Sequence, residues 1–212
     1  STVVGVDFAA DGELFDLWGG TAKMAFGAST SNAEVESNSV TYSLSATPVT
    51  TIANLTAEQR TNAVFSEFAL PLVGKPNPLP FVRRLDVQLA GRYEEIGTFS
   101  KFVPKVGLFW SPADEWLVRA SWSEGFRAPG VTEYLVAPSS ITSTLTDPRR
   151  TPTSTTGVLV SRGSNPNAQA EQSENIFLGL VYEPAFLKGL SLQANYYDTR
   201  QTDVLQLLSA QT

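Results

Sequence analysis

Apolar and polar positions alternate most regularly between residues 84 and 129. From 84 to 94, one set of alternating positions is mostly apolar: Leu85, Val87, Leu89, Gly91 and Tyr93. The same alternation recurs over residues 116–123, where tryptophan, valine and alanine oppose arginine and serine. Successive side chains of a strand point to opposite faces, so a period of two indicates strands with one apolar and one polar face. Long alternating runs with brief turns between them predict an antiparallel meander.

The same pattern predicts about eight long strands along the whole chain. They are expected at residues 2–16, 21–35, 61–73, 84–96, 101–110, 116–124, 171–183 and 190–204. The polar stretches 36–60 and 125–170 are expected to be loops, the second with a single helical turn near 129–135. Asp11-Gly12 interrupts the first run; we interpret it as a bulge within one strand, with a tight hairpin as the alternative.

The connections between these strands alternate in length. Those at 17–20, 74–83, 112–115 and 184–189 are short or pinned by proline, whereas those at 36–60 and 125–170 are long. The tight turn at 97–100 is the exception. Alternating short turns and long loops are typical of a transmembrane β-barrel with large extracellular loops. Trp18, Trp110, Trp116 and Tyr182 lie beside the short turns, where an interfacial aromatic girdle is expected. A soluble β-sandwich is the alternative, although its strands are usually shorter, about five or six residues.

Composition narrows the chemistry. The 212 residues include neither cysteine nor histidine and carry a net charge of −6. Disulfides and thiolate metal sites are therefore excluded, the usual general base is missing, and a nucleic-acid surface is disfavoured. Glu94 and Glu95 are adjacent on a predicted strand, so they point to opposite faces and cannot flank one bond. We predict no enzyme activity, no metal and no cofactor.

The sequence also excludes two targeting or anchoring elements. No uninterrupted apolar run is long enough for a transmembrane helix. No basic segment followed by an apolar core opens the chain, and Ser1 is not an initiator residue, so we expect a processed or internal piece of a longer protein.

Residues 91–135, GRYEEIGTFSKFVPKVGLFWSPADEWLVRASWSEGFRAPGVTEYL, resemble the mid-to-late barrel of TonB-dependent outer-membrane receptors. Further matching segments lie upstream (AVFSEFALPLV) and downstream (SNPNAQAEQSENIFLGLVYEP and GLSLQANYYDTRQTDVLQLL). The positions that carry the motifs, to which the resemblance gives a structural role, are Arg92, Tyr93, Gly125, Phe126, Arg127, Ala128, Pro129, Asn165, Pro166 and Glu171. One departure is Ala170, where the family usually has a proline before the glutamate.

The resemblance implies an all-β, antiparallel transmembrane barrel of about 22 strands in the bacterial outer membrane, with long extracellular loops. Residues 1–212 would form part of that barrel domain, without the plug domain or the TonB-binding segment. The rival is a complete eight-stranded barrel, but its narrow interior would have to pair many inward charges. Those positions are Lys23, Glu67, Asp86, Arg92, Glu94, Lys105 and Arg119.

The function implied by the resemblance is energy-coupled uptake of a scarce nutrient such as a ferric siderophore. Candidate ligand-binding residues in or beside the second long loop are Arg127, Tyr134, Arg149, Arg150 and Arg162. Their charged or hydrogen-bonding groups suit an anionic ferric chelate or a phosphorylated ligand. Alternatively, the arginines solvate the surface or bind lipopolysaccharide phosphates, and Arg127 bonds loop carbonyls. Outer-membrane lipid is the other expected partner. The alternative functions are a passive porin or small structural barrel, and a secreted β-rich carbohydrate-binding domain.

Overall fold

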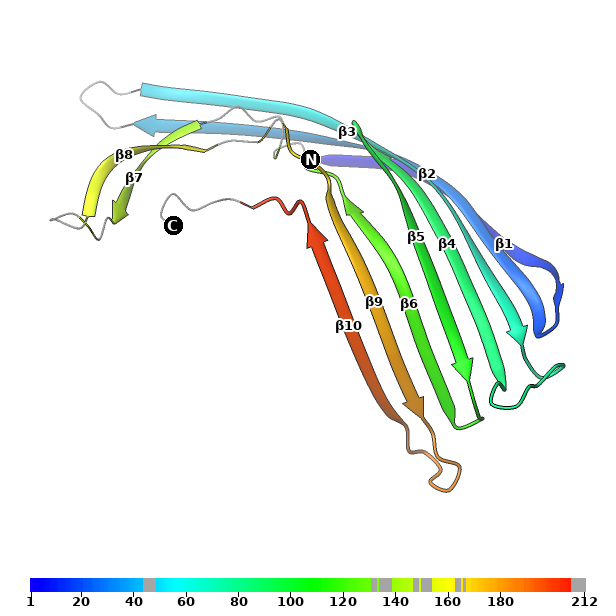
Figure 1. Cartoon of the computed structure of the whole chain (residues 1–212). Coiled ribbons are helices and arrows are strands. Elements are labelled where there is room, and N and C mark those ends of the chain that lie inside the picture. Colours follow the sequence, from blue (N-terminus) through cyan, green and yellow to red (C-terminus); the bar gives the residue numbers. More distant parts are fainter. Residues whose placement is uncertain are drawn as a thin grey trace.

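A computed structural model describes residues 1–43, 49–130, 133, 139–146, 149, 154–162, 165 and 167–206. Its strands are β1 (Thr2–Leu17), β2 (Gly20–Ser43), β3 (Val49–Val73), β4 (Arg84–Ile96), β5 (Phe99–Ser111), β6 (Trp116–Arg127), β7 (Ser139–Thr146), β8 (Ser154–Arg162), β9 (Glu171–Tyr182) and β10 (Leu192–Thr202). Eight of them form one antiparallel sheet in the order β1-β2-β3-β4-β5-β6-β9-β10, and β7 pairs with β8 separately (Figure 1). The predicted all-β fold class is confirmed. No helix in the described part is long and apolar enough to cross a membrane.

The register keeps the apolar positions of neighbouring strands on one face. Leu89 of β4 pairs with Phe68 on one side and Val106 on the other. Val106 pairs with Trp122 of β6, which pairs with Ile176 of β9. The sheet is a single layer, so this face stays open: Val64 is 54% exposed and Leu178 49%. A β-sandwich would cover such a face with a second sheet, and none covers it in the described part of the chain.

The aromatic residues expected beside the short turns lie there. Trp116 stacks on Tyr182 with ring centroids 4.2 Å apart. The indole Nε1 of Trp110 donates a hydrogen bond to the carbonyl of Phe81, at 3.0 Å. Trp18 lies in the β1–β2 turn and is 73% exposed. These positions match an interfacial girdle at one end of the sheet.

The expected loop at 36–60 was wrong in most of its length. β2 continues to Ser43 and β3 begins at Val49, and the two pair without interruption from Lys23–Ala69 to Ser43–Val49. Their common ribbon projects well beyond the other strands (Figure 1). Backbone hydrogen bonds pair the two strands. The sequence of this segment has no regular apolar alternation, so it does not predict the ribbon. Its tip, residues 44–48, lies outside the described residues.

The stretch 125–170, expected to be a loop, also contains regular structure. β6 continues to Arg127, and β7 and β8 form a hairpin with the register Ser139–Arg162. The helical turn expected near 129–135 falls mostly outside the described residues. Within them, the amide of Glu133 donates to the carbonyl of Gly130 at 2.8 Å, which closes one turn.

β1 is a single strand, as interpreted from the sequence, but its irregularity lies elsewhere. Asp11 and Gly12 pair regularly with Ala25 and Met24. The register shifts between Glu13 and Asp16, next to the β1–β2 turn.

β5 and β6 pair along only part of their length. Their ladder runs from Trp110–Val118 to Lys105–Ser123 and stops before Pro104. Proline has no N–H to donate, so the ladder cannot continue through it regularly. Beyond this point Lys101 of β5 forms an ion pair with Glu124 of β6 (3.4 Å), and it also donates to the side chain of Gln172.

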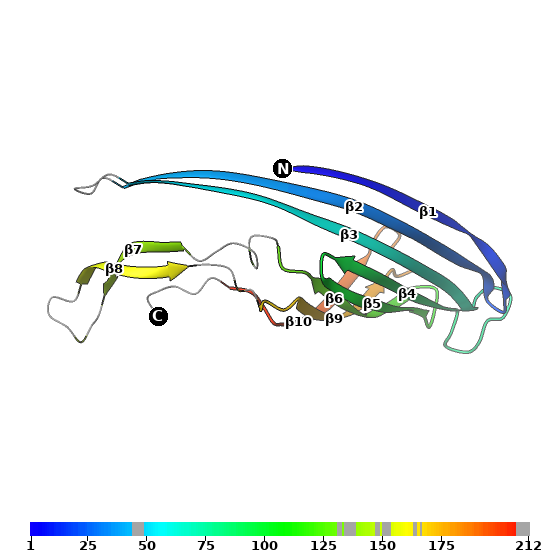
Figure 2. The ribbon, with the colours of Figure 1, turned by 90° about the horizontal axis from the view of Figure 1, so that it is seen from above.

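The short connections β1–β2, β3–β4, β5–β6 and β9–β10 lie at one end of the sheet. The ends of β2 and β3 at Ser43 and Val49, the β4–β5 turn, and the ends of β6 and β9 at Arg127 and Glu171 lie at the other (Figure 1). Seen from above, the sheet curves, with β1 and β10 at its two margins (Figure 2). The described residues show no pairing between these margins. Buried side chains are few and small, and none of those described is polar.

Candidate functional site

The polar face of the sheet carries the charges expected to point inward. The pairings Lys23–Ala69, Ala69–Gln88 and Ala90–Lys105 place residues of four strands on the same face. Two ion pairs follow β4: Arg92 to Glu94 at 3.0 Å, and Arg84 to Asp86. The eight-stranded sheet is therefore apolar on one face and charged on the other over most of its width.

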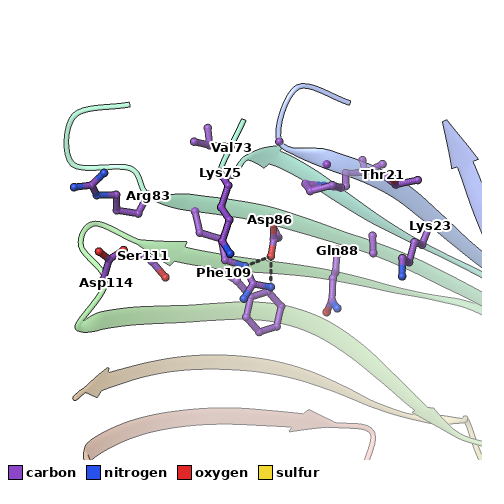
Figure 3. Close-up of a pocket in the computed structure, with 17 residues that line it drawn as sticks. Thr21, Lys23, Val73, Lys75, Arg83, Asp86, Gln88, Phe109, Ser111 and Asp114 are labelled. Carbon is purple, nitrogen blue, oxygen red and sulfur yellow. Dashed lines mark hydrogen bonds and ion pairs between the residues drawn. The ribbon is translucent and has the colours of Figure 1, made fainter. Parts of the chain in front are cut away.

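A hollow of about 640 Å³ lies on this polar face at the short-turn end (Figure 3). Lys23 of β2, Asp86 and Gln88 of β4, and Phe109 of β5 line its wall. Lys75 and Arg83 come from the β3–β4 connection. Four basic side chains (the fourth is Arg84) face two acidic ones (the second is Asp114), so the hollow is basic.

The turns that border this hollow are tightly fixed. The amide of Gly19 donates to the carbonyl of Pro71 at 3.2 Å, which joins the β1–β2 turn to β3. A Cβ on Gly74 would lie 2.1 Å from the carbonyl oxygen of Gly19, so this approach of the two turns requires glycine at position 74. Asn77 accepts from the amide of Gly74 (2.9 Å) and donates to the carbonyl of Leu72 (3.0 Å).

A cationic and aromatic patch continues the polar face across β6, β9 and β10. The guanidinium carbon of Arg119 lies 5.6 Å from the ring centroid of Phe177, within cation–π range. Its Nη2 donates to Asn195 at 3.4 Å, while its buried Nε has no partner among the described residues. Phe177 in turn lies 5.0 Å from the ring of Tyr197.

Arg127 has the densest polar contacts of the predicted site residues. It ends β6 directly opposite Glu171, the first residue of β9. Its Nε and Nη2 donate to the two carboxylate oxygens of Glu171, at 2.7 and 2.8 Å. Its Nη1 and Nη2 donate to the two oxygens of Glu133, at 3.0 and 3.1 Å. The alternative in which Arg127 bonds loop carbonyls is wrong about the acceptors, because both partners are carboxylates.

Further bonds extend this cluster to neighbouring segments. The amides of Gly130 and Leu205 donate to Glu133 (2.6 Å) and Glu171 (2.8 Å) respectively. Pro129 is fully buried, and its carbonyl accepts from the side chain of Gln59 of β3 at 3.3 Å. We call Arg127, Glu133 and Glu171 the arginine cluster.

The arginine cluster lies beyond the apolar band. On the apolar face the last tryptophan of β6 is Trp122, and the next position, Glu124, pairs with Glu174. Arg127 and Glu171 lie past this charged row. Hydrogen bonds from Arg127 lower the pKa of the Glu171 carboxyl to about 2 and lower that of Glu133, while both carboxylates raise the pKa of Arg127.

The other candidate ligand residues are not brought into one group in the described part. Arg149 is exposed in a turn. Arg162 ends β8, but its side chain lies outside the described part of the structure. Tyr134, Arg150 and Pro166 lie outside it entirely. Asn165 accepts from the amide of Asn167 and donates its own amide to the carbonyl of Glu133, at 3.0 and 2.9 Å.

The remaining motif positions have structural surroundings. Tyr93 lies on the apolar face and is 45% exposed. A Cβ on Gly125 would lie 2.3 Å from the hydroxyl of Ser173, so a glycine keeps β6 and β9 close there. Phe126 pairs with Gln172, and Ala128 is buried beside Pro129. Sequence reasoning missed Glu133, which meets Arg127 because the chain turns back after Gly130, and Gln59, whose partner Pro129 lies 70 residues away in the sequence.

The sequence matches a known protein family over nearly its whole length. The family described as "TonB dependent receptor-like, beta-barrel" matches residues 2–212. Solved structures with a similar fold include the siderophore receptor PirA from Pseudomonas aeruginosa, with 12% identity and a TM-score of 0.57. The match covers 93% of this chain and 32% of PirA. A mutant of the ferric enterobactin receptor PfeA from the same organism gives 15% identity and a TM-score of 0.62, with 95% of this chain covering 27% of the receptor. No curated protein matches.

The chain thus spans about a third or less of the length of these receptors. At such low identity the solved structures show the likeness of fold, whereas the family match covers nearly the whole sequence. The chain belongs to the TonB-dependent receptor β-barrel family, which consists of transport receptors of the bacterial outer membrane.

Proposed function

We propose that residues 1–212 form a sector of the barrel wall of an outer-membrane receptor that takes up a scarce nutrient through TonB-dependent energy coupling. The observation that carries this proposal is the single-layer sheet with one apolar and one charged face. In a barrel of this family the apolar face meets lipid, and the charged face lines a wide, hydrated interior. The plug and the TonB-binding segment would belong to other parts of the receptor.

The proposed cargo class is a small ferric chelate. Similarity to a siderophore receptor and a ferric enterobactin receptor supports it, as does the set of loop arginines. Arg149, Arg150, Arg162 and Tyr134 are the proposed ligand contacts, because guanidinium and phenol groups bind anionic oxygen donors through charge-assisted hydrogen bonds. The same arginines would contact lipopolysaccharide phosphates when no ligand is bound.

The test is uptake of radiolabelled iron by cells that carry the full-length protein as their only candidate receptor. Ferric enterobactin is the first probe, followed by a panel of ferric hydroxamates and ferric citrate. We expect uptake of one chelate to be saturable and to stop when TonB is deleted or the proton gradient is collapsed. Uptake that persists without TonB would contradict energy coupling and indicate a passive porin. No uptake of any chelate would contradict the cargo class.

A further inference from the structure

Side-chain and backbone hydrogen bonds hold together the two ends of the connection between β6 and β9. We call this closed base, where Arg127, Glu133 and Glu171 meet, the neck. We propose that Arg127 is a positioning residue that fastens the two ends of this connection and so holds the β7–β8 hairpin in one place relative to the wall. This inference does not depend on the proposed cargo or on energy coupling.

The path of the chain brings the two ends of this connection together. The connection leaves the sheet after Arg127 and returns at Glu171, so direct pairing of these residues closes its base. Six residues after Arg127, Glu133 returns to the same guanidinium and accepts two further bonds. The amide of Asn165 then donates to the carbonyl of Glu133 at 2.9 Å, joining the outgoing and returning segments. The hairpin therefore extends from a closed neck.

Most of the N–H donors of the Arg127 guanidinium are occupied. Its Nε, Nη1 and Nη2 all donate to carboxylate oxygens, in two bidentate arrangements. A planar guanidinium can serve two carboxylates in this way, whereas a lysine ammonium lacks the fork. Arg127 thus has little capacity left for a ligand, so we assign it to positioning and leave ligand contact to the other loop arginines.

Hydrogen bonds around the arginine cluster also involve segments at β3 and β10. Glu171 accepts from the amide of Leu205, just after β10, at 2.8 Å. On the other side, Gln59 of β3 donates to Pro129, which is fully buried. Segments adjoining β3, β6, β9 and β10 are thus joined around one side chain, which makes the neck part of the wall.

The charges of the arginine cluster predict what happens when Arg127 is removed. Two carboxylates share one guanidinium, so removing Arg127 leaves two anions facing each other in the neck. Their repulsion would favour separation of the segments that carry Glu133 and Glu171. A neutral residue at 127 should therefore open the neck and release the hairpin, with β6–β9 pairing below it unchanged.

The experiment measures a distance distribution between two spin labels on the full-length protein in detergent micelles. The labels are placed at Leu159→Cys in β8 and Gln201→Cys in β10, both exposed positions, and residues 1–212 contain no native cysteine. Any cysteine elsewhere in the full-length protein is replaced by serine. We expect one narrow distribution with native Arg127, a distribution at least twice as wide in Arg127→Gln, and an intermediate width in Arg127→Lys. Arg92→Gln is the matched control, since Arg92 pairs with Glu94 on the same wall.

Resistance of the folded barrel to unfolding in sodium dodecyl sulfate at room temperature checks that each variant is assembled. A second readout is the titration of Glu171 by carbon-13 NMR. Its midpoint should lie near pH 2 with native Arg127 and return to the ordinary range in Arg127→Gln. An unchanged distance distribution in assembled Arg127→Gln would overturn the proposal, as would equal broadening in Arg92→Gln.

Discussion

At the residue scale, the sheet depends on glycines where strands approach side chains closely. Gly27 of β2 lies between β1 and β3 and pairs with Phe65. A Cβ there would lie 2.5 Å from both the Phe65 ring and the carbonyl oxygen of Phe8. The ring can rotate away, but the backbone oxygen cannot, so position 27 requires a residue without a side chain.

We therefore expect Gly27→Ala to destabilise the folded protein by about 1–3 kcal/mol, the usual cost of overpacking. Gly12→Ala on the adjacent strand is the matched control, because nothing lies within 4 Å of its Cβ position. This control should leave stability unchanged or raise it slightly. Urea-induced unfolding in lipid vesicles measures both, and equal effects of the two substitutions would contradict the close packing at Gly27.

The arginine cluster shows which residue-scale features a sequence can reveal. Arg127 was identified from its motif, whereas the alternation before it predicted a strand ending at residue 124, three residues before the end of β6. Its partners could not be identified in the same way. Glu171 meets it only because β9 pairs with β6 across a long insertion, and Glu133 meets it only because the chain turns back after Gly130.

The same cluster gives stability a defined dependence on pH. Glu171 has a folded-state pKa below its unfolded value, so the unfolded state binds more protons between the two values. The contribution of the Arg127–Glu171 pair is therefore complete above about pH 4.5 and is lost as the pH falls towards 2. At neutral pH the neck should be insensitive to small changes in acidity.

At the element scale, β2 and β3 have two parts with different support. Below Glu34 and Thr61 each strand has neighbours on both sides, since β1 pairs with β2 up to Glu34 and β4 pairs with β3 from Thr61. Above these residues the two strands pair only with each other among the described strands. We call the parts of β2 after Glu34 and of β3 before Thr61 the outer ribbon. The other strands of the sheet pair without it.

Replacing residues 38–54 by an Asn-Gly turn should leave assembly of the barrel intact, because Ser37 and Leu55 are already paired. Deletion of Ala25 alone is the control. A one-residue slip moves every later side chain of β2 to the opposite face, so this deletion should prevent assembly. The measurement is the amount of protein inserted in the outer membrane and its heat-dependent shift in gel mobility. Failure of the shortened hairpin to insert would contradict the division into two parts.

The strands that the sequence predicted correctly are those with an apolar face. β1, β4, β5, β6, β9 and β10 were located within a few residues, because apolar and polar positions alternate along them. The outer ribbon and β7–β8 are rich in serine and threonine, and their strands pair through the backbone. Without an apolar face they have no period-two signal in hydropathy, so the sequence could not separate them from loops.

At the scale of the whole molecule, the sheet has one apolar and one charged face over most of its width. The order and antiparallel pairing of the eight strands followed from alternation and connection length. The curvature of the sheet and the basic hollow at the short-turn end required the structure, since they depend on twist and on contacts between turns (Figures 2 and 3).

The central claim is that the apolar face contacts lipid and the polar face contacts water. Single spin labels at Leu89, Val106 and Leu178 probe the first face, and labels at Gln88, Lys105 and Phe177 probe the second. In the full-length protein in lipid vesicles, we predict relaxation by oxygen, which concentrates in lipid, to dominate at the first set. Relaxation by a water-soluble nickel chelate should be stronger at the second set than at the first. Equal access of the nickel chelate to both sets would contradict the assignment of the faces.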